Sequence, residues 1–269
     1  MADVASSAPV VLTERQGRVM IITINRPDAR NAVNLAVHLG VGAAMQEAGR
    51  NPDIRAVILT GAGDQAFCAG ADLKALARGE KLVPDNAAEQ AWGFGGYVNH
   101  HITKPTIAAV NGFALGGGTE LTLASDLAVA ADTAMFGLPE VKRGIIAAAG
   151  GAFRLGMQLP QKIAMEILLT GDPITAQRAL DLGLVNAIVP RDQVVEAALK
   201  LANRITVNAP LSVQASKRIA RGIQDGRVVA EDSYWAATQR ERSMVMQSED
   251  AKEGPRAFAE KRPPVWTAR

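Results

Sequence analysis

Three consecutive glycines, Gly116 to Gly118, interrupt a stretch of small and apolar residues that runs from position 109 to 126. Glycine loses more backbone entropy on folding than any other residue and adds no side chain to a core. A run of three is therefore typical of backbone that must approach something closely. The residues that follow can form a helix, which would place the glycines at its N-terminus and Glu120 in its first turn.

Such a helix N-terminus has two interpretations. Its unpaired N–H groups and the helix dipole favour an anion or a developing oxyanion. Alternatively, the glycines only allow a helix to pack closely on a strand, and Glu120 complements the dipole. The stretch alone leaves both open.

The remaining pattern predicts an α/β core followed by helices. Strands are expected over 10–12, 19–24, 54–60, 106–110, 126–131 and 185–189, the first two as a hairpin. Helices are expected over 35–49, 87–102, 160–170, 175–182, 193–206, 211–224 and 229–246. Asn34 and Thr175 are in position to cap two of them. The turn signal at 209–211 divides the chain into a core over 1–208 and a helical region over 209–269.

Composition narrows the class of protein. The 269 residues, 48% of them hydrophobic, suffice for a full core. The net charge of +2 is spread without a basic stripe, so no nucleic-acid partner is expected. The start of the chain, MADVASSAPV, lacks the pattern of a secretory signal, and no apolar run is long enough to span a bilayer. One cysteine, Cys68, fits a reducing compartment. We therefore expect a cytoplasmic protein that does not bind membranes.

Several common kinds of site find little support. The segment GAGDQA at 61–66 resembles a dinucleotide fingerprint, but that fingerprint must open a helix, and here a loop is expected to continue. Cys68 has no evident histidine partner and is interpreted as a packing residue. His38, His100 and His101 lack the spacing of metal ligands, so no metal site is expected.

Two carboxylates remain, Glu120 and Glu140, each beside glycine-rich backbone. Two acids that face one pocket can divide the roles of acid and base if their surroundings separate their pKa values. Glu140 could equally be a solvated loop residue.

Four blocks in this order resemble the crotonase (enoyl-CoA hydratase/isomerase) superfamily. They are NRP…NA at 25–32, FCAGADL at 67–73, AAVNGFALGGGTEL at 108–121 and FGLPE…G…AGG at 136–151. The resemblance implies a crotonase-type spiral of ββα units with a C-terminal helical region that trimerises. It also implies an acyl-CoA substrate, a homotrimer or dimer of trimers, and no cofactor beyond the coenzyme A of the substrate.

The resemblance assigns roles to particular residues. The backbone N–H groups of Ala71 and Gly117 would form an oxyanion hole for the thioester oxygen. Glu120 would act as the base toward water, and Glu140 as the acid that protonates the α-carbon. The CoA-binding positions would be Arg26, Ala69, Gly70, Asp72, Leu73, Lys74, Gly116, Phe258 and Lys261. For Lys74 and Lys261, solvated surface is the alternative.

Both glutamates are present, so the resemblance favours hydration of a 2-enoyl-CoA. The run VKRG after Glu140 and the tail over 248–266 are closer to a bacterial branch that includes crotonobetainyl-CoA hydratases. Ala147 stands where typical short-chain hydratases have a proline, which removes a backbone restraint beside the pocket and leaves the acyl preference open. The alternatives are a 3-enoyl-CoA isomerase, a CoA-binding protein without turnover, and an RNA-binding protein. The last is disfavoured because Lys162 is the only base in the helix expected over 160–170.

Overall fold

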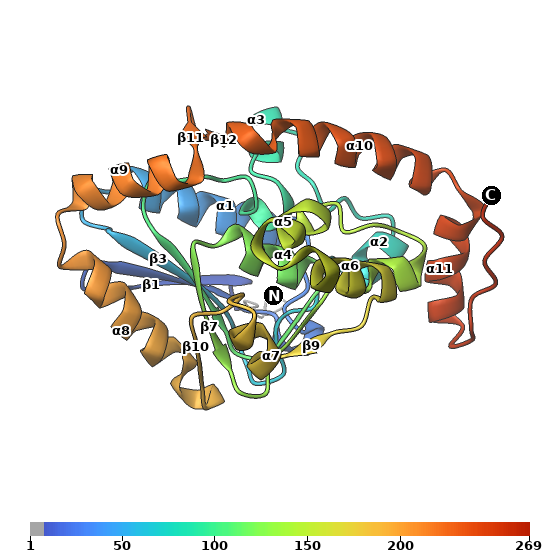
Figure 1. Ribbon diagram of the computed structural model, residues 1–269, viewed down its shortest axis with the longest axis horizontal. Helices are drawn as coiled ribbons and strands as arrows, with labels where there is room; N and C mark the ends of the chain where they lie inside the picture. The colour runs from blue at the N-terminus through green and yellow to red at the C-terminus, as the bar shows by residue number, and fades with distance from the viewer. Residues whose placement is uncertain (1–7) are drawn as a thin grey trace, which may run out of the picture.

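The computed structural model describes residues 8–269 (Figure 1). Its central sheet is formed largely by apolar runs of the sequence. Its order is β1-β2-β3-β5-β7-β10. The bounds are β1 (Val11–Gln16), β2 (Val19–Ile24), β3 (Ala56–Gly61), β5 (Thr106–Val110), β7 (Leu127–Ala131) and β10 (Ala187–Val189). The predicted hairpin is confirmed, because β1 pairs antiparallel with β2, whereas the other pairs are parallel. Every residue of β3 and β5 is buried, as in parallel strands covered on both faces.

A second sheet has the order β4-β6-β8-β9. Its strands are β4 (Ala66–Cys68), β6 (Phe113–Leu115), β8 (Met135–Gly137) and β9 (Ile174–Thr175). Consecutive strands alternate between the sheets: β3 precedes β4, β5 precedes β6, and β7 precedes β8. Helical segments follow each pair, so the chain repeats a ββα unit. The second sheet brings the loops after its strands together, and these loops carry the predicted site residues.

Helices cover both sheets. Their bounds are α1 (Leu35–Arg50), α2 (Leu73–Ala77), α3 (Ala87–Gln90), α4 (Gly117–Ala124), α5 (Gly151–Gln158), α6 (Gln161–Thr170), α7 (Ala176–Asp181), α8 (Val194–Thr206), α9 (Pro210–Arg221), α10 (Asp232–Met246) and α11 (Glu249–Ala259). The 3-10 turns are η1 (Pro27–Ala29), η2 (Phe94–Gly96), η3 (Pro139–Arg143), η4 (Arg191–Gln193) and η5 (Val229–Glu231), and β11 (Ile223–Gln224) pairs with β12 (Arg227–Val228). Both predicted caps are confirmed: Asn34 accepts from the N–H of Val37, and Thr175 from that of Arg178.

The helix predicted over 87–102 is wrong beyond its first turn. Helix α3 ends at Gln90, and Gly93, Gly95 and Gly96 then take φ values of 72°, 67° and 67°. The chain forms a tight loop against α1, where a side chain at position 96 would overlap the carbonyl of His38. His100 therefore does not lie on a helix, and its ring stacks on Trp92 with centroids 5.1 Å apart. Three glycines in four residues favour this loop over a continued helix.

The C-terminal helices follow an arc around the core, with α9 and α10 on one side and α11 at the end (Figure 1). Helix α11 packs against η3, and a side chain at Gly254 would overlap the carbonyl of Arg143. The division at 208–209 falls between α8 and α9 and stays a prediction. Across residues 8–269, no helix is both long and apolar enough to cross a membrane. The expectation about a secretory signal rests largely on residues 1–7, which lie outside the described part.

Candidate active site

The three glycines form the start of α4, as predicted. Helix α4 begins at Gly117, and every one of its residues is buried. A side chain at Gly118 would overlap the carbonyl of Cys68, and one at Gly117 would overlap the ring of Phe94. Gly116 takes φ 55° and ψ −122°, in the region that favours glycine. Close packing thus explains Gly118, and it also brings the N-terminus of α4 against two other segments.

The loop after β4 meets this N-terminus. A Cβ built on Gly70, whose φ is +91°, would lie 3.3 Å from the backbone nitrogen of Gly117. Val33 forms a parallel bridge with Ala71, in which the Val33 N–H donates to the carbonyl of Gly70 and the Asp72 N–H donates to that of Val33. In such a bridge the N–H of the middle residue points to the other side. Neither the Ala71 N–H nor the Gly117 N–H donates to any residue within 8–269. Two neighbouring donors are therefore available to one acceptor.

The Glu120 carboxylate is held by the N-terminus of a different helix. The side chain is buried, and its Oε1 accepts from the N–H of Ala149 at 2.7 Å and from that of Gly151 at 2.9 Å. These donors flank Gly150, whose φ of +99° forms the turn into α5. Oε2 accepts no hydrogen bond from the described part of the chain. The glutamate is thus fixed through one oxygen and leaves the other free for chemistry.

The second carboxyl, Glu140, lies on η3 directly after Pro139. Its Oε1 would be 3.1 Å from a Cβ built on Gly116, which places it beside the start of α4. Its Oε2 is buried and has no hydrogen-bond partner among residues 8–269. The interpretation of Glu140 as a solvated loop residue is therefore wrong. Unlike Glu120, which accepts from the N–H groups of two other residues, this carboxyl has only its own backbone N–H to favour its anion.

The two glutamates interact electrostatically. Burial raises the pKa of Glu120 above its usual range, although the N–H groups of Gly151 and Ala149 and the charge of Arg154 oppose this rise. Burial also raises the pKa of Glu140, and the charge of Glu120 raises it further. When two acids are buried close together, the negative charge of one disfavours ionisation of the other, so the pair tends to hold one proton. The hydrogen bonds favour the anion at Glu120 and the proton at Glu140.

The residues predicted to bind CoA fall into two groups. Gly70 and Gly116 lie at the junction described above, as does Ala69, whose N–H donates to the carbonyl of Arg30. Arg26 forms an ion pair with Asp72 at 2.8 Å, and Asp72 caps α2. These two side chains therefore hold the loop that contains Ala71.

Other predicted CoA-binding residues lie on the surface. Leu73 and Lys74 are exposed on α2. Phe258 is exposed on α11, where the guanidinium of Arg143 lies 4.2 Å from its ring centroid. Lys261 follows the C-cap residue of that helix and is exposed, with a φ of 54°. Because α11 packs on η3, Phe258 is connected to the segment that carries Glu140. The CoA-binding roles stay predictions.

Cys68 is fully buried beside this site. Burial raises the pKa of its thiol to about 12. The thiol therefore stays protonated, and the interpretation as a packing residue is confirmed. Within residues 8–269, no group of three His, Cys, Asp or Glu side chains is placed to hold a metal ion.

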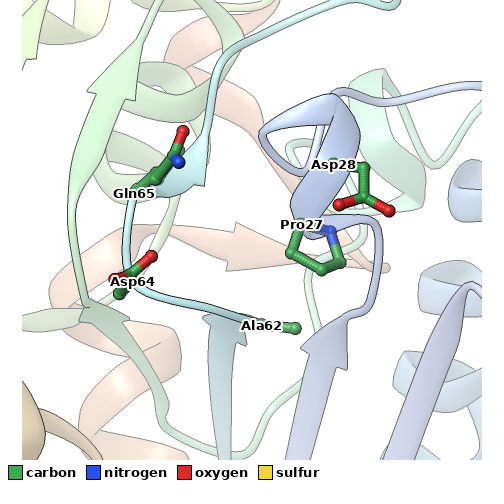
Figure 2. A pocket seen from close by; sticks show the side chains of 6 residues that line it. Pro27, Asp28, Ala62, Asp64 and Gln65 are labelled. Atoms are coloured by element: carbon green, nitrogen blue, oxygen red, sulfur yellow. The ribbon is translucent and has the colours of Figure 1, made fainter.

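A cavity of about 340 Å³ lies away from the glutamates. It is lined by Pro27, Asp28, Ala62, Asp64, Gln65 and Ala66. Figure 2 shows the turn after β2 facing the loop after β3 across this cavity. The loop is the segment that resembles a dinucleotide fingerprint, and strand β4 follows it instead of a helix. The rejection of that fingerprint is confirmed, and the cavity contains none of the candidate catalytic groups.

Sequence reasoning missed three parts of the site. Helix α5, whose N-terminus binds Glu120, was not among the expected helices, although its glycine pair is part of the fourth sequence block. Phe94, which lies over Gly117, was assigned to a helix. Arg154, a buried residue of α5, pairs with Glu231, which is 77 residues away in the chain. Nothing in the local sequence indicates that last contact.

Comparison with known proteins relates the chain to one family. The model of the enoyl-CoA hydratase/isomerase family matches residues 14–269. A carnitinyl-CoA dehydratase of Salmonella typhi is 42% identical over 259 residues, which cover 95% of this chain and 97% of that protein. The crystal structure of a carnitinyl-CoA hydratase from Mycobacterium avium is 62% identical with a TM-score of 0.95, covering 98% of this chain and 100% of that one. An enoyl-CoA hydratase structure from Mycobacterium tuberculosis H37Rv is 46% identical, with a TM-score of 0.75 and coverage of 97% and 100%.

Proposed function

Because the chain belongs to the enoyl-CoA hydratase/isomerase family, we propose that it adds water reversibly across the double bond of a 2-enoyl-CoA. One observation carries the proposal. Two carboxyls withdrawn from solvent, one held by two N–H donors of a neighbouring helix and one with only its own backbone N–H, lie beside two backbone N–H groups that have no acceptor within residues 8–269. This arrangement matches the needs of the reaction, which are a base, an acid and an oxyanion hole.

In the proposed mechanism, the thioester oxygen accepts from the N–H groups of Ala71 and Gly117. Oε2 of Glu120 takes a proton from water as the water oxygen bonds to the β-carbon. The π electrons move toward the thioester oxygen, which becomes an enolate oxygen stabilised by the two donors and by the N-terminus of α4. Glu140 then gives its proton to the α-carbon, and the thioester carbonyl forms again. Water is added without a change in overall oxidation state, so the reaction needs no redox cofactor.

The assignment of acid and base rests on the hydrogen bonds. Glu120 has two N–H donors on Oε1, which favour its anion and orient Oε2. Glu140 has only its own backbone N–H to favour its anion, and burial and the negative charge of Glu120 outweigh it, so Glu140 retains a proton. We further propose that the enzyme is cytoplasmic and assembles as a homotrimer or a dimer of trimers. The exposed apolar side chains of Leu211 and Ile219 on α9 support an assembly.

Within this reaction we propose that the acyl group is crotonobetainyl, whose hydration gives carnitinyl-CoA. Both the Salmonella typhi relative and the Mycobacterium avium structure carry a carnitinyl-CoA name. The ring of Phe94 lies against Gly117, next to the position of the thioester oxygen. In crotonobetainyl-CoA the trimethylammonium group is on the γ-carbon, and an aromatic ring within reach of that carbon would suit it, because a quaternary cation is attracted to a ring face.

We expect kcat/KM for crotonobetainyl-CoA to exceed that for crotonyl-CoA at least about tenfold, the scale of one desolvated cation–π contact. Phe94→Leu should lower the value for crotonobetainyl-CoA and leave that for crotonyl-CoA nearly unchanged. Loss of enoyl-thioester absorbance measures both. Equal use of both substrates would contradict the acyl assignment and leave hydration standing. Failure of every 2-enoyl-CoA in a panel would contradict hydration itself.

A further inference from the structure

A buried ion pair joins the C-terminal helical region to the helix that holds Glu120. Arg154 of α5 is 1% exposed, and its Nε and Nη2 donate to Glu231 at 3.0 and 2.6 Å. Glu231 ends η5 and directly precedes α10. The indole N–H of Trp235 donates to the same carboxylate at 3.3 Å. A buried charge is tolerated only when it is paired and hydrogen-bonded, so this contact fixes both helices.

The same guanidinium lies against the turn that binds Glu120. A Cβ built on Gly150 would lie 3.2 Å from Nη1 of Arg154 and 3.2 Å from the ring of Trp235. Nη1 is buried and makes no hydrogen bond within the described part of the chain. The residues on either side of Gly150 donate the two N–H groups that hold Oε1 of Glu120. The path from Glu231 to Glu120 thus runs through one side chain and one three-residue turn.

Arg154 also brings a positive charge toward the glutamates. The titratable groups that face Glu120 are Glu140 on η3, Cys68 on β4 and Arg154 on α5. Around the ion pair lie His101 and Arg221, with Lys217 near His101. Burial dominates at Glu120 and raises its pKa, whereas the charge of Arg154 acts in the opposite direction.

We propose that Arg154 is a positioning residue for the base: held by Glu231, it fixes the Ala149–Gly151 turn on Glu120, and its charge favours the Glu120 anion. The C-terminal helical region therefore sets the basicity of an active site built by the core. This inference rests on the proposed role of Glu120. It assigns to Arg154 no contact with substrate.

Removal of the positive charge and removal of the negative charge of this ion pair should shift the pH profile in opposite directions. Arg154→Met removes the positive charge, so the acidic limb of the pH profile of kcat/KM should move up by about one unit, the scale of an opposite charge at short range. Glu231→Gln leaves the positive charge uncompensated, so the same limb should move down. In Arg154→Met, kcat should fall about tenfold or more because the turn loosens, while KM stays within about twofold. A purely structural role would not shift the limb in opposite directions.

Arg178→Met is the matched control, because Arg178 is exposed on α7, and its profile should equal that of wild type. The double variant Arg154→Met/Glu231→Leu separates loss of the ion pair from loss of folding. An apolar pair of similar volume often replaces a buried ion pair without loss of stability. We expect it to fold as well as wild type, with the acidic limb between those of wild type and Arg154→Met and with kcat still reduced. Unshifted limbs in both single variants, or wild-type kcat in the folded double variant, would overturn the proposal.

A readout without turnover separates this inference from the proposed function. The carboxyl band of Glu120 is followed by infrared difference spectroscopy during a pH titration, and Glu120→Gln identifies the band. The band should titrate at higher pH in Arg154→Met and at lower pH in Glu231→Gln. If wild type adds no water to any enoyl-CoA but the band shifts as expected, the proposed function fails and the electrostatic inference stands. If wild type is active and the band does not move, the inference alone fails.

Discussion

Replacement of either glutamate by glutamine is expected to lower kcat for hydration at least about a hundredfold, the usual contribution of a general acid or base. Glutamine keeps the size of the side chain, and the amide oxygen of Glu120→Gln can still accept from the Ala149 and Gly151 N–H groups. It cannot exchange the proton that the reaction requires. KM should change much less, because neither carboxyl holds the CoA. Steady-state loss of enoyl-thioester absorbance measures both constants.

The matched control is Glu166→Gln, an exposed glutamate on α6, which should keep wild-type turnover. A variant at position 120 or 140 that keeps wild-type kcat would show that the carboxyl is not part of the reaction. Variants that lose hydration but still move the double bond of a 3-enoyl-CoA would favour an isomerase. The same pair of variants therefore distinguishes the two reactions of the family.

A methyl group at the oxyanion hole should have an effect of similar size. In Gly117→Ala, the new Cβ would overlap the ring of Phe94 and would lie 3.2 Å from the Cα of Gly70. Either the ring or the N-terminus of α4 must move, and the Gly117 N–H then no longer lies beside that of Ala71. Loss of one oxyanion donor lowers kcat by about 10²–10³. We expect a decrease in this range, measured with the same assay.

Gly156→Ala is the control for this substitution, because a Cβ there meets no atom within 4 Å, and activity should be unchanged. The double variant Gly117→Ala/Phe94→Ala tests the cause. It removes the ring that a Cβ would overlap, so part of the lost kcat should return with a small substrate such as crotonyl-CoA. Wild-type activity in Gly117→Ala would show that this donor is not required in its present position.

The sequence was sufficient for much of the fold. The helical spacing of apolar residues and the capping residues Asn34 and Thr175 predicted the starts of α1 and α7. Apolar runs predicted the buried parallel strands β3 and β5. The crotonase-type fold expected from the four blocks is confirmed by the family match and by the solved structures that cover almost the whole chain. These features depend on local residue choice, which a single sequence displays.

Features decided by distant contacts were missed. The loop over 91–100 depends on glycines that fit against α1, and the sequence there also reads as a helix. Helix α11 was not among the expected helices; it contains Pro255, yet it packs on η3. At the site, the motifs predicted both glutamates and both N–H donors, whose roles stay predictions. The pairing of Arg154 with Glu231 depends on where α10 returns to the core, which no local pattern encodes.

The central claim is that both glutamates and both N–H groups act on one enoyl thioester. Its most direct test is the reaction of wild type with a 2-enoyl-CoA panel in D₂O, with the products analysed by NMR. The account predicts a 3-hydroxyacyl-CoA with one deuterium on the α-carbon, and no such product with Glu120→Gln or Glu140→Gln. Absence of any hydrated product from the wild-type enzyme, or its replacement by a 3-enoyl-CoA that carries deuterium on the α-carbon, would contradict it.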